Sequence, residues 1–374
     1  MSSRSEALDS LRQEPPRRRN GRRVASIDAF RGFVLLGSFI AEAHVSALRE
    51  MPGSPIRNAL LTPLSHSGWD GCTPVDLGFP AYIMLIAMSI VLSYDRRLKH
   101  GEHRSQLFQR LAVRSALLFV FATIYHGGLS VPVGEMRITR IFHRLAIAIF
   151  FSGLFELVLG LTGKVIALAS VLTGYWALMQ FVPVPGYGPG VYTAEGNLNH
   201  YIDRVLLGAE TYFVLSTLGV AGTCLMGLLS GSVLLGERSP QLRLFCFVGA
   251  GIALVNLGLL LGLVCPINKH IWTPSFVVYS SGWILLIFSG FFLLTEVWGW
   301  TRWTFPLQVL GRNPLVAFAS IGLLPWGRYA DLFAGDGLAP LLGGAQPLVQ
   351  ATVQILLWWS LLFWLDRNNL IIKI

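Results

Sequence analysis

The sequence is poor in charged residues, and this shortage decides the class of protein. Asp, Glu, Lys and Arg make up only 13% of the 374 residues, hydrophobic residues make up 53%, and the mean hydropathy is +0.58. Such a chain is too apolar for a soluble domain. Uncharged runs of roughly 17 to 25 residues recur, the length that a helix needs to cross a bilayer. Because they lack the alternation of barrel strands, we expect an all-α polytopic membrane protein.

Cysteine is also scarce, and metal-binding patterns are missing. The four residues Cys72, Cys224, Cys246 and Cys265 show no metal-like spacing and fall in or beside apolar runs, so we interpret them as packing residues rather than a disulfide framework. No HExxH or CxxC motif occurs, and we expect no metal ion. Residues 1–25 are polar and arginine-rich without an apolar core. This pattern argues against a cleaved signal peptide and predicts a disordered, basic cytoplasmic tail.

The net charge of +9 comes largely from connectors between apolar runs, which favours a role in topology over nucleic-acid binding. Five arginines between residues 17 and 23 place the N-terminus in the cytoplasm by the positive-inside rule, and the basic connector 95–110 follows on the same side. About ten spans then return the C-terminus to the cytoplasm of an inner (plasma) membrane, whereas an eleventh would place it outside. The expected spans are residues 27–48, 74–94, 111–127, 141–160, 165–182, 212–236, 244–264, 273–296, 306–325 and 347–365.

A polar cluster lies directly before the uncharged part of the second span. It contains Trp69, Asp70, Cys72, Thr73 and Asp76 as well as a titratable histidine, His66. An imidazole can remove a proton from a hydroxyl or an amine, or attack a thioester itself. The two aspartates either orient the ring or cap the following helix together with the threonine. If the chain catalyses a reaction, we expect the reaction here.

Other ionisable and amide side chains in or beside spans supply further candidates. Glu42 lies inside the first span, where such groups usually face the bundle interior or a water-filled cavity, and it is a candidate to assist His66. Asp28 and Arg31 share a helix face, and their simplest interpretation is an intrahelical pair. The remaining candidates are Arg137, Arg140, His143 and Arg144 at the outer start of the fourth span, Asn268, Lys269, His270, Trp272 and Thr273 before the eighth, and Asn313 in the ninth.

These clusters match, in order, the motifs of a known family. SIDAFRG at 26–32 is similar to SxDxxRG, and HSGWDGCTPVDLGFP at 66–80 to HxxWxGxxxxDLxFP. RIFHRLAI at 140–147, INKHIWTPSF at 267–276 and GRNPL at 311–315 are similar to xxLQRIAL, NKxLWTxSF and GxNAL. From residue 26 onward the chain therefore resembles the heparan-α-glucosaminide N-acetyltransferase family and its bacterial transmembrane acyltransferase relatives.

The resemblance implies that residues 26–374 form a transmembrane acyltransferase domain. It would bind acetyl-CoA from the cytosol as co-substrate and acetylate an amino sugar, of glucosamine or N-acetylglucosamine type, on the periplasmic side. The family's active-site histidine falls on His66, as general base or acyl acceptor; the family has Asn in place of Glu42 and Gln in place of His143. The expected roles are catalysis for His66, Asp76 and Glu42, acetyl-CoA binding for Asp28, Arg31, Arg96, Arg97, Arg110 and Asn313, and acceptor or oxyanion contacts for Trp69, Arg144, Asn268, Lys269 and Trp272.

Two other functions remain open from the sequence. Ten spans, Pro- and Gly-interrupted helices and intramembrane charges also suit a secondary transporter of a sugar or related solute, although no repeat between the halves is evident. The other possible function is that of a binding or export partner that retains an acyltransferase fold without its activity. In each case the partners include membrane lipid, and the small residues along the sixth span make a homodimer reasonable.

Overall fold

The computed structural model describes residues 24–51, 53–127, 139–209 and 211–370. These residues form helices joined by loops, with no β-strand among them, and nine of their helices are long and apolar enough to cross a membrane. The prediction of an all-α polytopic membrane protein is confirmed. The nine are α2 (Ala25–Glu50), α4 (Gly78–Lys99), α5 (Arg104–Tyr125), α6 (Ile141–Val158), α7 (Leu161–Phe181), α9 (Thr217–Leu235), α10 (Pro240–Gly262), α11 (Pro274–Phe292) and α16 (Gln346–Arg367).

The expected ninth span, 306–325, is not one continuous helix. It consists of α12 (Phe305–Arg312) and α13 (Pro314–Leu323), which meet at Asn313 with φ −118° and ψ 56°. The break has a local cause, because Pro314 disfavours helical geometry in the residue before it. By length and composition the described residues thus contain nine candidate spans where about ten were expected.

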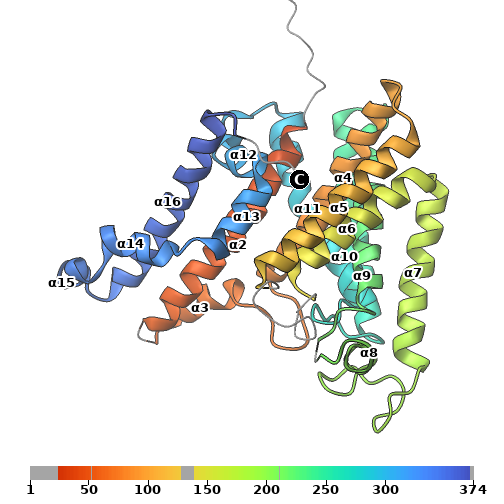
Figure 1. The fold of residues 1–374 in the computed structure, drawn as a ribbon, viewed down its shortest axis with the longest axis horizontal. Helices are drawn as coiled ribbons and strands as arrows, with labels where there is room; N and C mark the ends of the chain where they lie inside the picture. Colours follow the sequence, from red (N-terminus) through yellow and green to blue (C-terminus); the bar gives the residue numbers. More distant parts are fainter. Residues whose placement is uncertain (1–23, 52, 128–138, 210, 371–374) are drawn as a thin grey trace, which may run out of the picture.

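Both ends of the described chain lie at the same end of the bundle, here called the terminus end (Figure 1). Ser26 N–H donates to Glu296 Oε1 at 3.4 Å, which joins the start of α2 to the π-helical turn after α11. Arg312 at the end of α12 pairs with Asp366 near the end of α16 at 2.8 Å. The expected tail, residues 1–25, lies almost entirely outside the described residues, and its cytoplasmic placement stays a prediction.

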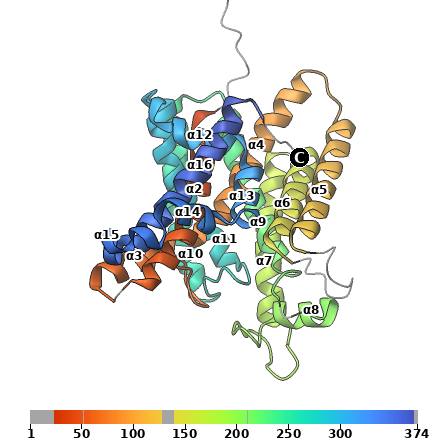
Figure 2. The ribbon, with the colours of Figure 1, turned by 60° about the vertical axis from the view of Figure 1, so that its left-hand side comes forward.

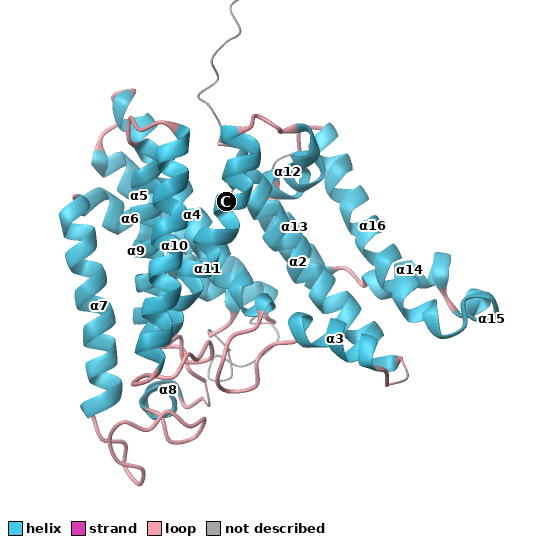
Figure 3. Cartoon of the chain, turned by 180° about the vertical axis from the view of Figure 1, so that it is seen from behind, coloured by secondary structure: helices cyan, strands magenta, loops and turns pink. Residues whose placement is uncertain are grey.

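The opposite end of the bundle, here called the loop end, carries the longest loops and two short helices (Figure 3). Helix α3 (Pro55–Leu64) leads into the polar segment 65–77, and α8 (Leu198–Leu207) lies in the Pro/Gly-rich connector 183–211 between the expected fifth and sixth spans. The connector 326–346 between the last two expected spans contains α14 (Trp326–Ala334) and α15 (Ala339–Leu342), on the other side of the molecule from α8 (Figure 2).

Helix α4 runs through the middle of the bundle and connects its two ends. It packs against α9 and α6 and also contacts α2 and α11. Glycines on α9 permit this close packing, as expected for the sixth span: a Cβ on Gly227 would lie 2.7 Å from the Met84 carbonyl oxygen of α4. All four cysteines are free thiols, and two of them, Cys224 and Cys265, are buried. Any group on the first turn of α4 therefore shares a rigid helix with groups at the terminus end.

Candidate active site

The central feature at the loop end is a hydrogen bond between a histidine and a buried carboxylate. His66 Nδ1 lies 2.6 Å from Asp76 Oδ1; the histidine side chain is 66% exposed, whereas that of the aspartate is completely buried. The other carboxylate oxygen, Oδ2, accepts the backbone N–H groups of Ser67 at 3.1 Å and Thr73 at 2.9 Å. Because a carboxylate only accepts, Nδ1 carries the proton, and the lone pair of Nε2 is left for chemistry.

A lysine from a distant part of the chain completes this arrangement. Lys269 Nζ lies 2.5 Å from Asp76 Oδ1, the oxygen that also binds His66, and its side chain is only 15% exposed. The Asp76 carboxylate therefore binds both the His66 ring and the positively charged Lys269 ammonium group. Asp76 is placed to orient His66 and also caps the turn η1 (Pro74–Leu77) before α4, so the two alternatives left open by the sequence occur together. Asp70, the other candidate to orient the ring, instead accepts Asn268 Nδ2 at 3.3 Å.

Asn268 joins the loop before α4, which carries His66, to the loop before α11, which carries Lys269. Its side-chain amide donates to the Trp69 carbonyl at 2.7 Å as well as to Asp70, and its Oδ1 accepts the His270 N–H at 2.8 Å. Gly71 N–H donates to the Ile267 carbonyl at 2.8 Å, and its φ of +99° is a conformation that glycine tolerates. Since both amide protons of Asn268 are used in these contacts, the geometry favours a positioning role over that of an oxyanion donor.

Aromatic rings pack around Trp69, which follows the histidine of the His66–Asp76 pair, here called the dyad. Trp69 stacks on His270 with 5.2 Å between ring centroids and 9° between planes, and Tyr212 meets it edge-on at 5.2 Å. The Trp69 indole N–H donates to the Tyr192 carbonyl at 2.7 Å, which fixes the ring against the Pro/Gly-rich loop. The expected acceptor-side residue Trp69 thus lies three residues after His66 in sequence, and its ring is packed and held in one orientation.

Arg144 and Trp272, also expected on the acceptor side, lie together in a neighbouring layer. The Arg144 guanidinium donates to Ser216 Oγ at 2.8 Å and to the Tyr212 carbonyl at 2.7 Å, and it lies 5.9 Å from the Trp272 ring centroid. The Trp272 indole N–H donates to Thr223 Oγ1 at 3.0 Å. The hydrogen bonds described for these two residues go to Ser216, Tyr212 and Thr223 and not to the dyad.

Two further candidates, Glu42 and His143, are not brought to the dyad. In the described part of the chain the Glu42 carboxylate makes no hydrogen bond or ion pair, and it lies within electrostatic reach of Tyr125 rather than joining His66. His143 is completely buried, with Nε2 3.2 Å from Thr123 Oγ1. Arg137 lies outside the described residues.

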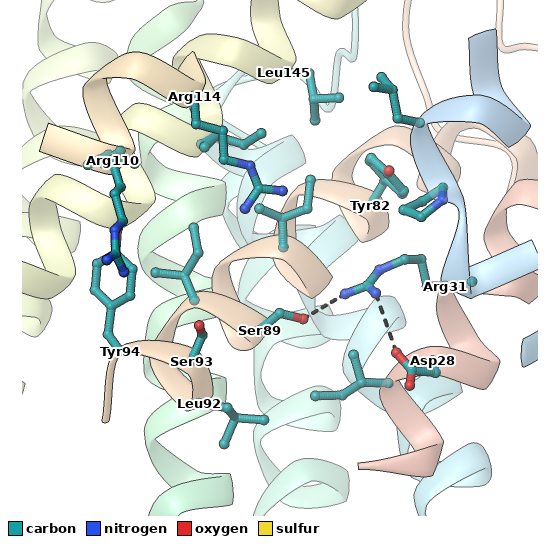
Figure 4. A pocket seen from close by; sticks show the side chains of 18 of the residues that line it. Asp28, Arg31, Tyr82, Ser89, Leu92, Ser93, Tyr94, Arg110, Arg114 and Leu145 are labelled. Atoms are coloured by element: carbon teal, nitrogen blue, oxygen red, sulfur yellow. Dashed lines mark hydrogen bonds and ion pairs between the residues drawn. The ribbon is translucent and has the colours of Figure 1, made fainter. Parts of the chain in front are cut away.

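A second site, a cavity of about 560 Å³, opens at the terminus end between α2, α4, α5, α6 and α12 (Figure 4). Five of the six residues expected to bind acetyl-CoA line it. Arg31 Nη2 crosses from α2 to Ser89 Oγ of α4 at 2.6 Å, and Arg31 Nη1 lies 3.4 Å from Asp28. Asn313 is the exception: it is completely buried, and its Nδ2 donates to the Leu370 carbonyl at 2.9 Å. The five that line the cavity are Asp28, Arg31, Arg96, Arg97 and Arg110.

Sequence reasoning missed six polar residues in this cavity, namely Tyr82, Ser89, Ser93, Tyr94, Arg114 and Arg312. For Arg114 a signal was present, because it is an arginine inside the expected third span, and ionisable residues within spans usually face a partner or a water-filled space. Tyr82 and Ser89 carried no such signal, since uncharged polar residues are common in membrane helices.

Comparison with known proteins finds similarity to the same family as the motifs. No protein-family model matches the chain. It is 24% identical to the heparan-alpha-glucosaminide N-acetyltransferase of Mus musculus, over 100% of this chain and 64% of the relative, and 25% identical to that of Homo sapiens, over 68% and 48%. The chain thus spans less than two thirds of the length of these curated relatives. The family resemblance that its motifs predict is confirmed, and the chain is a distant relative of the heparan-alpha-glucosaminide N-acetyltransferases.

Proposed function

We propose that this chain is a transmembrane acyltransferase, which takes an acetyl group from acetyl-CoA at the terminus end and passes it to an amino sugar at the loop end. The observation that carries the proposal is the His66–Asp76 dyad placed at one end of α4, whose other end lines a cationic cavity. The names of the two relatives, both N-acetyltransferases that act on a glucosaminide, support the same chemistry.

In the proposed reaction the exposed Nε2 of His66 takes a proton from the attacking amine or hydroxyl of the sugar. The sugar atom bonds to the thioester carbonyl carbon, the carbon–sulfur bond breaks, and the proton passes to the departing thiolate. In the alternative course Nε2 attacks the thioester carbonyl carbon, and the carbon–sulfur bond breaks to release the CoA thiolate. The sugar atom then bonds to the acetyl carbon, the bond from that carbon to Nε2 breaks, and the sugar's proton passes to the freed Nε2 and on to the thiolate. In both, Asp76 stabilises the imidazolium that forms, as the orienting carboxylate of a catalytic triad does.

The polarity of the bundle suits entry of the donor at the terminus end. Its polyanionic part would meet the arginines at the end of α4 and the start of α5, which the positive-inside rule assigns to the cytoplasm. An inner-membrane location with both termini cytoplasmic, and a homodimer, are part of this proposal. Trp69 and Asn268 then position the loop-end site, and Lys269 holds the Asp76 carboxylate in its charged form.

The test is acetyl-CoA turnover by the purified full chain in detergent, with glucosamine or N-acetylglucosamine as acceptor and CoA release as readout. His66→Ala should lower the rate at least 100-fold, because a positioned base contributes about 10²- to 10⁴-fold. His100→Ala, which changes an exposed histidine at the far end of α4, is the matched control and should leave the rate unchanged. Full turnover in His66→Ala would refute the assignment, and sugar uptake into vesicles without CoA release would favour the transporter.

A further inference from the structure

The cationic cavity has two levels along α5. Arg110 lies in the second turn of α5, near the mouth, and Arg114 lies one turn deeper. Ten residues separate Arg114 from the first residue of the helix, which corresponds to about 15 Å and about half of the helix length. The cavity therefore brings positive charge to the middle of helix α5, three residues inside the apolar run that begins at residue 111.

The arginines at the mouth already have acidic partners. Glu102 Oε2 lies 2.5 Å from Arg110 Nη1 and 3.9 Å from Arg97 Nη1, and all three side chains are partly exposed. Arg96 is exposed beside them. The arginines at the mouth are thus exposed to solvent, and Glu102 offsets part of their positive charge. Such a site suits a weak contact with a group that stays near the surface.

The deeper level is different. In the part of the chain that the structure describes, the Arg114 guanidinium has no hydrogen bond or ion pair, and Figure 4 shows it pointing into the same central space as that of Arg31. Among the described residues that line the cavity, Asp28 is the single carboxylate, and it lies 3.4 Å from Arg31. Two guanidinium groups therefore face one space with a single negative charge, and such an excess inside a span is stabilised by an anionic ligand.

One more charged residue lines the cavity, Arg312, and it is paired with Asp366 at 2.8 Å. The rest of the described lining, apart from the two levels, is uncharged. Tyr82 and Ile86 of α4, Leu118 of α5, and Leu145 and Ile149 of α6 complete the wall. A ligand that fills the cavity must therefore end its anionic part at Arg31 and Arg114 and continue toward the loop end as an uncharged chain.

From this arrangement we infer that Arg114 and Arg31 form a deep subsite for the diphosphate of the donor, separate from a mouth subsite of Arg96, Arg97 and Arg110 for a second, outlying phosphate. The inference rests on the proposed function for the identity of the donor. It assigns to CoA a fixed depth: the ribose 3′-phosphate stays at the mouth, the diphosphate reaches the level of Arg114 near the middle of helix α5, and only the uncharged pantetheine arm passes further.

The experiment measures dissociation constants by calorimetry, with the full chain in detergent and three probes: CoA, 3′-dephospho-CoA and pantetheine. Arg114→Gln should weaken binding of CoA and of 3′-dephospho-CoA about 10- to 100-fold each, because a charge-assisted contact is lost, and should leave pantetheine binding unchanged. Arg96→Gln should weaken CoA binding a fewfold and leave 3′-dephospho-CoA unaffected. Arg302→Gln, at an exposed arginine outside the cavity, is the matched control, and Arg114→Lys should recover part of the lost affinity.

The outcomes separate this inference from the proposed function. Equal weakening of all three probes by Arg114→Gln, or no binding of CoA by the unmodified chain, would overturn the two-level assignment. Weakening of CoA alone by Arg114→Gln would also overturn it, because Arg114 would then contact the 3′-phosphate. The expected pattern of dissociation constants without any acyl transfer would support the subsites and refute the proposed function.

Discussion

Replacing Asp76 by Asn tests the dyad most directly, because the two side chains have the same shape. Asp76 is completely buried and accepts from His66 and Lys269 at Oδ1 and from two backbone N–H groups at Oδ2. An asparagine offers one acceptor oxygen and one NH₂ group. Whichever way it is turned, two of these donors then face another donor, and Lys269 loses its negative partner.

The magnitude follows from the contacts that are lost. A hydrogen bond to a charged group contributes about 1.5–3 kcal/mol, so two lost bonds lower the free energy of unfolding by about 3 kcal/mol or more. For a protein of this size that corresponds to a fall in Tm of about 5 °C or more. The rate should fall by about 10² to 10⁴, because an amide no longer holds His66 in the reactive tautomer, as in triad enzymes.

Two measurements check this prediction, namely thermal unfolding in detergent followed by tryptophan fluorescence and CoA release with a sugar acceptor. Asp70→Asn is the matched control: Asp70 is exposed and accepts one long bond, 3.3 Å from Asn268, so its Tm and rate should change little. If Asp76→Asn behaves like Asp70→Asn in both measurements, the dyad neither holds the loop end together nor catalyses.

Three further predictions concern other parts of the molecule. Burial raises the pKa of the Cys72 thiol to about 12, so its maleimide labelling, followed by mass spectrometry, should be slow at pH 7 and accelerate as pH rises to 9; rapid labelling at pH 7 would contradict this. Glu42→Gln should lower the rate of CoA release less than tenfold, because the Glu42 carboxylate does not contact His66. A 100-fold loss would instead show that Glu42 takes part in catalysis. A Cβ on Gly32 would overlap the Leu307 carbonyl, whereas one on Gly37 meets nothing within 4 Å, so Gly32→Ala should lower the Tm in detergent while Gly37→Ala should not.

The membrane class and most spans could be predicted from sequence, because hydrocarbon imposes one requirement on every span: a long, uncharged helix. The expectation of one long helix per apolar run was wrong at residues 306–325. The hydropathy there is continuous, and only the proline after Asn313 indicates the break between α12 and α13. Helix α5 also begins at Arg104, seven residues before the expected start, since charged residues at a span end are helical without being apolar.

The candidate site could be predicted only in part. The loop that holds His66 was predictable as the site, but the sequence offered both Asp70 and Asp76 as partners of the ring, and only the fold shows that Asp76 contacts it. The third member, Lys269, is 193 residues from Asp76, and no local pattern specifies that contact. It depends on Asn268, whose amide joins the two loops, and such a tertiary contact is invisible to periodicity or composition.

The link between the two sites is likewise a property of the folded helix rather than of any motif. Asp76 precedes α4, and Tyr82, which lines the cavity, follows six residues later, a rise of about 10 Å. Arg96 and Arg97 end the same helix at the cavity mouth. One continuous helix therefore sets the distance between the anion-binding levels and the dyad. A donor whose diphosphate is held at Arg114 needs to extend only its uncharged arm along α4 to present an acyl group near His66, so no phosphate has to cross the membrane for the acyl group to do so.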